Sequence, residues 1–257
     1  MDKVVIQQQL IDYQASDGLL EGKVILVTGA GDGIGRAAAL SYAQFGATVI
    51  LLGRTTEKLE QVYDDIVSQG YPQPAIYPLD LKSATIDDFS TLKTQLEAEF
   101  SILHGLLHNA SILGDRKPVA STDQLLWQEV LQVNVNATFM MTQALLPLLE
   151  RAQEASIIFT SSGVGRKGKA YWGAYATSKF AIEGLMEVLA DELENTSHIR
   201  VNSLNPGATN TAMRRTAYPG EQPTNNPDSQ DIMPAYLYLM GSDSQGVNGQ
   251  KLNAQSR

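Results

Sequence analysis

The sequence predicts a three-layer α/β fold in which helices cover both faces of a doubly wound, mostly parallel sheet. Three observations predict it. Short apolar stretches rich in β-branched residues alternate with longer stretches of helical period. The apolar stretches are nearly continuous, as in strands that are buried on both faces. A glycine-rich turn joins the first of these strands to the first helix of the alternating pattern.

The expected strands are short and follow one another at spacings that leave room for a helix between them. They cover residues 23–28, 48–52, 75–78, 105–108, 156–160 and 200–204. The expected helices cover residues 34–45, which Gly46 ends, and residues 56–68, 86–100, 122–149 and 175–194. Right-handed crossovers between parallel strands would place a ligand beyond the carboxyl ends of these strands.

Residues 212–229 interrupt this pattern. Pro219, Pro223 and Pro227 stand there among Asn, Gly and Thr residues, which is typical of a loop. A long loop in a compact fold often covers a ligand, so we expect a substrate lid over this range. No internal repeat or linker is visible, and we expect residues 1–257 to form a single domain.

Composition argues against several classes of function. The net charge is -9 and no cluster of Lys and Arg stands out, so we expect no nucleic-acid partner. The chain has no cysteine, and His104, His108 and His198 lack metal-ligand spacing, so no metal site is expected. The N-terminal residues are polar, and no apolar run approaches the roughly 18 residues that span a bilayer. We therefore expect a soluble, unprocessed, cytoplasmic protein that does not bind membranes.

A glycine-rich loop follows the first expected strand directly. It reads Thr28-Gly29-Ala30-Gly31-Asp32-Gly33-Ile34-Gly35. Glycines permit a sharp turn and let backbone amides approach a pyrophosphate at the positive end of the next helix. A tightly packed turn without a ligand is the alternative for this motif alone, whereas a Walker A loop is excluded because no Gly-Lys-Ser/Thr follows. The strand-loop-helix context favours a dinucleotide.

The residues after the second and third strands bear on which dinucleotide binds. Gly53-Arg54 stands where the adenosine ribose would lie. A carboxylate there would hold the ribose diol of NAD, whereas a guanidinium pairs with a 2'-phosphate, so we expect NADP(H). An ordinary solvated charge is the alternative for Arg54. Asp80 could accept a hydrogen bond from the adenine or could cap a turn.

A candidate acid/base pair lies in the helix expected at residues 175–194. Tyr175 and Lys179 are one helical turn apart on one face, and a nearby cation would lower the pKa of the phenol toward a useful range. Such a pair alone is usually an exposed surface pair. Ser162, however, ends a strand at the same sheet edge and could bind a substrate oxygen or cap a turn. Asn134 interrupts an apolar helix and could hold a water or satisfy backbone groups.

Taken together and in this order, these motifs resemble the short-chain dehydrogenase/reductase family, whose fold is the Rossmann fold. The resemblance covers residues 20–252. The segments around the glycine loop, the second strand, Asn109 and Asn134 are in addition similar to one bacterial subgroup of oxidoreductases. It rests on Thr28-Gly29-x-x-x-Gly33-x-Gly35, Asn109-Ala110-Ser111, Asn134, Ser162, Tyr175-x-x-x-Lys179 and Pro206-Gly207-x-x-x-Thr211. It implies an NADP(H)-dependent carbonyl reductase or alcohol dehydrogenase that transfers a hydride between nicotinamide and a carbonyl or hydroxyl carbon.

The resemblance also implies a role for each residue. Tyr175 would be the acid/base, and Lys179 would hold the nicotinamide ribose and lower the pKa of Tyr175. Ser162 would orient the carbonyl of the substrate. Asn134 would position a water that links Lys179 to solvent. Asn109 and Ala110 would line the adenosine ribose. The other implied cofactor-binding residues are Gly29, Asp32, Gly33, Ile34, Gly35, Arg54, Asp80, Leu81, Pro206, Gly207, Thr209 and Thr211.

Two positions depart from the family pattern. His108 stands where the family often has Asn, and residues 249–255 lack the usual Asp-Gly-Gly close. We interpret His108 as a structural residue rather than a proton carrier. The departure at residues 249–255 bears on the shape of the substrate pocket and on subunit contacts.

Other functions and partners are open to the same sequence. A non-catalytic sensor or scaffold that binds NADP(H) is disfavoured because Ser162, Tyr175 and Lys179 are all present, and an NAD-linked dehydrogenase is disfavoured by Arg54. By analogy, we expect a homodimer or homotetramer that pairs through the helices at residues 122–149 and 175–194. The expected substrate is a small carbonyl or alcohol. Arg214 and Arg215 could bind an acidic substrate or could simply be solvated.

Overall fold

The computed structural model describes residues 3–256, and these form one seven-stranded sheet. Every pair of neighbouring strands is parallel, in the order β3-β2-β1-β4-β5-β6-β7. The strands are β1 Val24–Thr28, β2 Thr48–Gly53, β3 Ala75–Pro78, β4 Gly105–His108, β5 Ala155–Thr160, β6 Ile199–Asn205 and β7 Lys251–Asn253. The predicted doubly wound α/β fold is confirmed.

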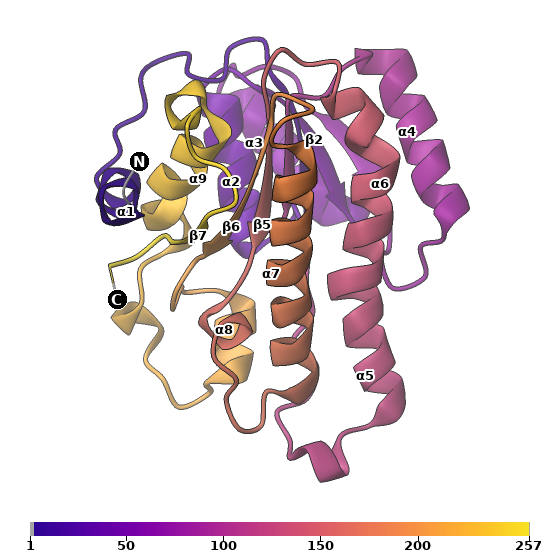
Figure 1. Ribbon diagram of the computed structural model, residues 1–257, viewed down its shortest axis with the longest axis vertical. Helices are drawn as coiled ribbons and strands as arrows, with labels where there is room; N and C mark the ends of the chain where they lie inside the picture. The colour runs from indigo at the N-terminus through magenta and orange to yellow at the C-terminus, as the bar shows by residue number, and fades with distance from the viewer. Residues whose placement is uncertain (1–2, 257) are drawn as a thin grey trace.

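Helices cover both faces of the sheet (Figure 1). One face carries α2 Gly33–Gln44, α3 Thr56–Ser68 and α9 Met233–Met240, with α1 Lys3–Ile11 outside α9. The other face carries α4 Ile86–Phe100, α6 Ala137–Leu149 and α7 Gly173–Leu193, and α5 Gln124–Leu131 leads into α6. The short helix α8 Ala212–Ala217 lies beyond β6.

The sheet separates two apolar cores because successive strand residues point to opposite faces. In β1, Ile25 and Val27 pack into the core under α2, α3 and α9, whereas Leu26 packs into the core under α4, α6 and α7. These β1 side chains are fully buried. This double burial explains why the strands are apolar without interruption.

The strand order places the site. It reverses between β1 and β4, where the chain winds outward in opposite directions, and such a switch point leaves a crevice at the carboxyl ends of the strands. The glycine loop follows β1 there, Asn109 follows β4, and Ser162 follows β5. Three segments far apart in sequence are thus brought to one sheet edge.

Several elements were not expected from the sequence. The helix α1 lies in a segment that reads as polar, but Ile6 and Leu10, one turn apart, are buried against α9. The helix α9 is almost uniformly apolar, so it shows no amphipathic period. The strand β7 has only three residues. Each lacks the periodic signal by which an element is recognised.

The expected lid and the expected long helix need correction. The range 212–229 is not a continuous loop, because it begins with α8, which Thr211 caps by accepting a hydrogen bond from the Arg214 amide. The prolines that suggested a loop come only after this helix. The helix expected at residues 122–149 starts at Gln124 and contains a π-helical turn, η2 Gln132–Asn136, between α5 and α6.

Two further findings concern the described residues only. Within residues 3–256, no helix combines the length and the apolar character needed to cross a membrane. The same residues bring together no group of three or more His, Asp or Glu side chains that could hold a metal ion.

Candidate active site

A cavity of about 470 Å³ lies at the carboxyl ends of the strands. It collects every site residue predicted from the sequence except Gly35 and Asn134. The predicted residues that line it are Gly29, Asp32, Gly33, Ile34, Arg54, Asp80, Leu81, Asn109, Ala110, Ser162, Tyr175, Lys179, Pro206, Gly207, Thr209 and Thr211. The glycine loop and the Tyr175-Lys179 pair therefore face one common space.

The glycine loop adopts a conformation that requires glycine. Gly29 and Gly33 have φ angles of 68° and 52°, in the left-handed region that side chains disfavour. A Cβ atom on Gly35 would lie 2.1 Å from the carbonyl oxygen of Gly29. Gly35 therefore serves the close packing of α2 on the loop rather than the cavity wall. The packed loop directs the N-terminus of α2 at the cavity, as a bound diphosphate requires.

Near α3, the cavity wall carries the cationic side chains of Arg54 and Lys58. Asp32 caps α2 by accepting a hydrogen bond of 2.7 Å from the Gly33 amide, and its carboxylate also pairs with Lys58. The hydrogen bond from Lys58 is the main reason that the pKa of Asp32 is lowered. The side chain of Arg54 is exposed beside this pair. Sequence reasoning missed Lys58, although it lies in the first turn of α3, just after Arg54.

The ends of β1 and β4 are tied together by Thr28. Its hydroxyl accepts hydrogen bonds from the amides of Asn109 (2.9 Å) and Ala110 (3.0 Å) and donates to the carbonyl of Leu107. These bonds hold Asn109 and Ala110 at the cavity wall. Asp80 accepts a hydrogen bond from the Lys82 amide, which is the turn-capping arrangement, and also lines the cavity.

The loop after β6 is held in place by hydrogen bonds from the side chain of Gln255. The side-chain amide of Gln255 donates to the carbonyls of Pro206 (2.7 Å) and Ala208 (2.9 Å). Gly207 has a φ of 74°, and a Cβ atom there would lie 2.7 Å from Nε2 of Gln255. Residues that depart from the family pattern thus shape this wall of the cavity.

Tyr175 is buried, and its pKa differs from the sequence-based expectation. Burial raises the pKa to about 12, while the neighbouring hydroxyls of Ser162 and Ser111 lower it in part. The ammonium of Lys179 lies 5.6 Å from the centre of the tyrosine ring. The expectation that Lys179 brings the pKa down is not met, because the loss of solvation of the phenolate outweighs the stabilising interactions.

Lys179 is itself almost completely buried. Its ammonium donates a hydrogen bond of 2.8 Å to the carbonyl of Thr160, and burial lowers its pKa to about 8. Glu183, one turn later on α7, opposes this decrease through its negative charge. The ammonium therefore loses its proton at mildly alkaline pH.

Glu183 is the centre of a buried polar network that sequence reasoning missed. Its carboxylate accepts hydrogen bonds from the hydroxyls of Ser161 (2.5 Å) and Ser203 (2.7 Å) and from Nε of Arg166 (3.0 Å). Ser161 immediately precedes Ser162, so the network holds the turn that presents Ser162. An acidic residue within the apolar sequence Phe-Ala-Ile-Glu-Gly-Leu-Met was the available signal.

Asn134 lies in the π-helical turn η2 and does not line the cavity. Its side-chain amide accepts a hydrogen bond from the Ile112 N–H (2.9 Å) and donates one to the Ile112 carbonyl (3.0 Å). It also donates to the hydroxyl of Ser178 (3.0 Å). The sequence left open whether Asn134 satisfies backbone groups, and it does so here. Ile112 lines the cavity, so Asn134 positions a wall segment.

His108 has the surroundings of a structural residue. Its ring is buried, stacks on Phe159 at a centroid distance of 4.9 Å, and places Nε2 2.8 Å from the hydroxyl of Thr142. Burial, with a smaller contribution from the charge of Lys179, lowers its pKa to about 3. His108 is therefore uncharged over the physiological range, in line with the structural interpretation.

The cavity also has an apolar and aromatic end, part of which falls in the range expected as the substrate lid. Trp172 immediately precedes α7 and packs with Tyr175, Ala176 and Ala217. The additional residues that line the cavity near this end are Ser111, Ile112, Leu113, Trp172, Met213, Arg214 and Ala217. Ser111 belongs to a motif and Met213, Arg214 and Ala217 lie in the expected lid range, whereas Ile112, Leu113 and Trp172 carried no such signal.

Comparison with known proteins now defines the class. A family model described as short chain dehydrogenase matches residues 23–222. The chain belongs to this family of oxidoreductases, as the sequence motifs predicted.

Individual relatives place the chain more closely. YciK of Escherichia coli (strain K12), an oxidoreductase described as uncharacterized, is 52% identical over 243 residues, which are 95% of this chain and 96% of YciK. A solved short chain dehydrogenase from Pseudomonas syringae is 60% identical, with a TM-score of 0.94 over 95% of this chain and 99% of that one. Another, from Escherichia coli CFT073 in complex with NADPH, is 53% identical, with a TM-score of 0.92 over 94% of this chain and 100% of that one. The expected bacterial subgroup is confirmed.

Proposed function

We propose that this chain is an NADP(H)-dependent carbonyl reductase or alcohol dehydrogenase. The observation that carries the proposal is that the glycine loop and Ser162, Tyr175 and Lys179 line one common cavity. A purely structural interaction protein would leave this convergence unexplained. The complex of a similar protein with NADPH supports the choice of cofactor.

The residues present fit a nicotinamide dinucleotide. A Cβ atom on Gly29 would lie 3.1 Å from Cα of Ala110, so the bare backbone lets the loop pack closely on the segment after β4 while it lines the cavity. The loop from Gly29 to Gly35 would hold the diphosphate, Arg54 the 2'-phosphate, and Asn109 and Ala110 the adenosine ribose. The remaining contacts would come from Asp80 and Leu81 at the adenine and from Pro206, Gly207, Thr209 and Thr211 near the nicotinamide and the diphosphate.

The chain's own residues would manage the proton and the substrate oxygen. When bound, the cofactor supplies the hydride that a carbonyl carbon receives. Ser162 would donate a hydrogen bond to the carbonyl oxygen, and Tyr175 Oη would donate its proton to that oxygen as negative charge develops on it. Because burial raises the pKa of Tyr175 to about 12, its phenol carries the proton near neutral pH. This favours the reductive direction.

The first prediction concerns Tyr175→Phe. The change removes the proton donor and keeps the ring, so we expect turnover to fall at least about a hundredfold while NADPH binding is kept within about twofold. The measurements are NADPH oxidation with a carbonyl substrate and NADPH binding by fluorescence. Retained turnover in this variant would refute the assigned acid/base role.

The second prediction concerns the choice between NADP(H) and NAD(H). Arg54→Ala removes the guanidinium proposed to pair with the 2'-phosphate, so we expect the Kd of NADPH to rise about tenfold or more and that of NADH to stay within about twofold. Arg151→Ala is the control, because Arg151 is a similarly exposed cation that pairs with Glu97 away from the cavity. Equal losses of NADPH and NADH affinity would show that Arg54 does not recognise the phosphate.

The first experiment is titration of the purified protein with NADPH and with NADH, followed by NADPH oxidation with ketones, aldehydes and quinones. Tighter binding of NADPH together with turnover supports the proposal. Tight binding without turnover on any carbonyl favours the sensor or scaffold, and tighter binding of NADH favours the NAD-linked dehydrogenase. If neither dinucleotide binds, the reductase, the sensor or scaffold, and the NAD-linked dehydrogenase are all contradicted.

Two further parts of the proposal concern the setting of the enzyme. We propose that it forms a homodimer or homotetramer through α6 and α7, the pairing that the family resemblance implies. We also propose a cytoplasmic location, which suits a protein without cysteine and with NADPH as reductant.

A further inference from the structure

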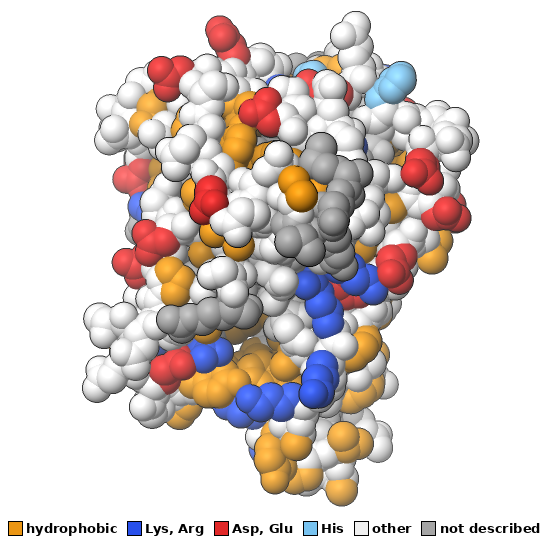
Figure 2. Space-filling view, turned by 60° about the vertical axis from the view of Figure 1, so that its left-hand side comes forward, with side chains coloured by type: hydrophobic (Ala, Val, Ile, Leu, Met, Phe, Trp, Pro, Cys, Tyr) orange, Lys and Arg blue, Asp and Glu red, His pale blue; other side chains and the backbone are white. Residues whose placement is uncertain are grey.

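Three cations gather around Tyr218, beside the aromatic end of the active-site cavity, and of these Arg214 lines the cavity while Arg116 and Lys169 are exposed next to it. The ring of Tyr218 is contacted by the guanidinium of Arg214 at 3.9 Å, the guanidinium of Arg116 at 4.7 Å and the ammonium of Lys169 at 5.7 Å from the ring centre. We call Arg116, Lys169 and Arg214 the cationic cluster. Figure 2 shows hydrophobic side chains in a hollow at the height of α8, with Lys and Arg side chains around it.

The cluster carries more positive charge than its neighbours neutralise. Arg214 is paired with Glu221 through two hydrogen bonds of 2.6 Å, which lower the pKa of Glu221 to about 2. Within residues 3–256, no carboxylate lies within 4.0 Å of a nitrogen of Arg116 or Lys169. In a chain whose net charge is -9, two such cations beside one ring indicate a place for an anion.

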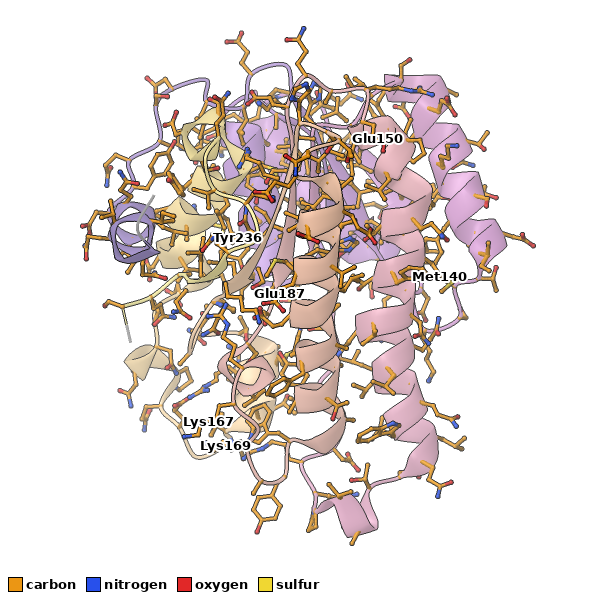
Figure 3. All side chains as sticks on the ribbon, in the orientation of Figure 1. Met140, Glu150, Lys167, Lys169, Glu187 and Tyr236 are labelled. Atoms are coloured by element: carbon orange, nitrogen blue, oxygen red, sulfur yellow. The ribbon has the colours of Figure 1, made fainter. Side chains whose placement is uncertain are left out.

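The cluster is close to the reacting group. Arg116 stacks on Trp172 at 4.7 Å from the ring centre, and the ring of Trp172 lies 5.8 Å from that of Tyr175. Only the indole therefore separates the Arg116 guanidinium from the phenol. Arg116 also donates a hydrogen bond to the carbonyl of Ala217, which lines the cavity. Lys169 approaches from the segment that leads into α7, beside α8 (Figure 3).

Trp172 supplies a second, independent observation. It is 7% exposed, and its indole N–H is buried without a hydrogen-bond partner among the described residues. A buried donor without an acceptor is costly, and because Trp172 lines the cavity, an acceptor on a bound ligand would remove this cost. A negatively charged oxygen at the edge of the indole, beside the guanidinium of Arg116, would meet both needs.

We propose that the substrate is a carbonyl compound that also carries an anionic group, such as a carboxylate, separated from the carbonyl by an apolar spacer. Arg116 and Lys169 bind the anion, Trp172 donates to it, and the spacer packs along Leu113, Met213 and Ala217. This proposal rests on the proposed reductase function, because it assigns the carbonyl to Tyr175. Arg214 contributes less, because Glu221 neutralises it.

The decisive test does not depend on turnover. The protein loaded with NADP⁺ is titrated by calorimetry with benzoate and with benzamide, which match in shape and differ in charge. We expect benzoate to bind about tenfold more tightly, and higher ionic strength to reduce this preference. The preference should disappear in Arg116→Gln and weaken in Lys169→Gln. Benzoate binding no more tightly than benzamide to the unmodified protein would overturn the proposal.

A matched control separates this site from general electrostatics. Lys117 neighbours Arg116 in sequence, but its ammonium pairs with Asp115 at 2.6 Å and takes no part in the cluster. Lys117→Gln should therefore keep the preference for benzoate. An equal loss in Lys117→Gln would assign the effect to net charge and overturn the proposal.

Turnover then distinguishes failure of this inference from failure of the function. With NADPH, 4-formylbenzoate should be reduced with about tenfold higher kcat/KM than its neutral methyl ester, and Arg116→Gln should bring the ratio of the two values toward one. Equal rates for acid and ester would contradict the anion site and leave the reductase intact. Benzoate selectivity without reduction of any carbonyl would contradict the reductase function instead.

Discussion

At the scale of single residues, burial decides the protonation of the active site more than neighbouring charges do. The pKa of Tyr175 is raised and that of Lys179 lowered, and loss of solvation is the largest cause of both shifts. Sequence spacing shows that the two side chains share a helix face, but it does not show how deeply that face is buried. The direction of the shift therefore became visible only in the structure.

The third prediction follows from Glu183, whose charge supports the protonated form of Lys179. Lys179 is charged below its pKa of about 8 and neutral above it, so activity that needs the ammonium falls as the pH rises through that value. In Glu183→Gln the supporting charge is lost while an oxygen acceptor for Ser161 remains. We expect the alkaline limb of kcat/KM for carbonyl reduction to move to lower pH.

A profile from about pH 6 to about pH 10 checks this expectation. A variant that is merely misfolded would lose the same fraction of activity at every pH and would keep the midpoint. An unchanged alkaline midpoint in Glu183→Gln would therefore contradict the role assigned to Glu183.

At the scale of elements, the sequence predicted best where one pattern dominates. The helices α3 and α4 have the expected bounds because each buries a periodic apolar stripe, such as Leu59, Val62 and Ile66 in α3. The π-helical turn at η2 was not predicted, because it depends on the bonds of Asn134 to Ile112 and Ser178, which are distant in sequence. The motifs thus located most of the cavity wall, whereas the aromatic end depends on packing between α7 and α8.

The fourth prediction tests how the glycine loop and α2 fit together. In Gly35→Ala the new Cβ would meet the carbonyl oxygen of Gly29 at 2.1 Å, so α2 must move away from the loop. We expect a loss of about 2 kcal/mol or more in the free energy of unfolding and weakening of NADPH binding by at least about tenfold. Chemical denaturation and NADPH titration are the measurements.

Gly246→Ala serves as the comparison for that experiment. A Cβ atom on Gly246 would meet nothing within 4 Å, and its φ is not in the left-handed region, so we expect a change within about 0.5 kcal/mol. Similar behaviour of the two variants would show that the close approach of α2 to the loop is not required.

At the scale of the whole molecule, the helices α6 and α7 run side by side along one face (Figure 1). Leu189 of α7 is buried, but Phe180 is 46% exposed. Val188 is 56% exposed two turns further along α7, and Gly184 lies between them, where a Cβ atom would meet nothing within 4 Å. Two apolar side chains flanking a bare glycine form a surface that a second copy can match across a two-fold axis.

The last prediction tests this pairing in solution. We expect the unmodified protein to sediment as a dimer or tetramer, and Phe180→Glu to shift it toward the mass of one chain, because a carboxylate would be buried against its own copy. Val67→Glu is the control, since Val67 is 45% exposed on α3 in the opposite helical layer and undergoes the same change of charge. Cofactor binding should persist in both variants, because neither residue lines the cavity. An unmodified protein that sediments as a single chain, or a Phe180→Glu variant that keeps its full assembly, would contradict association through α7.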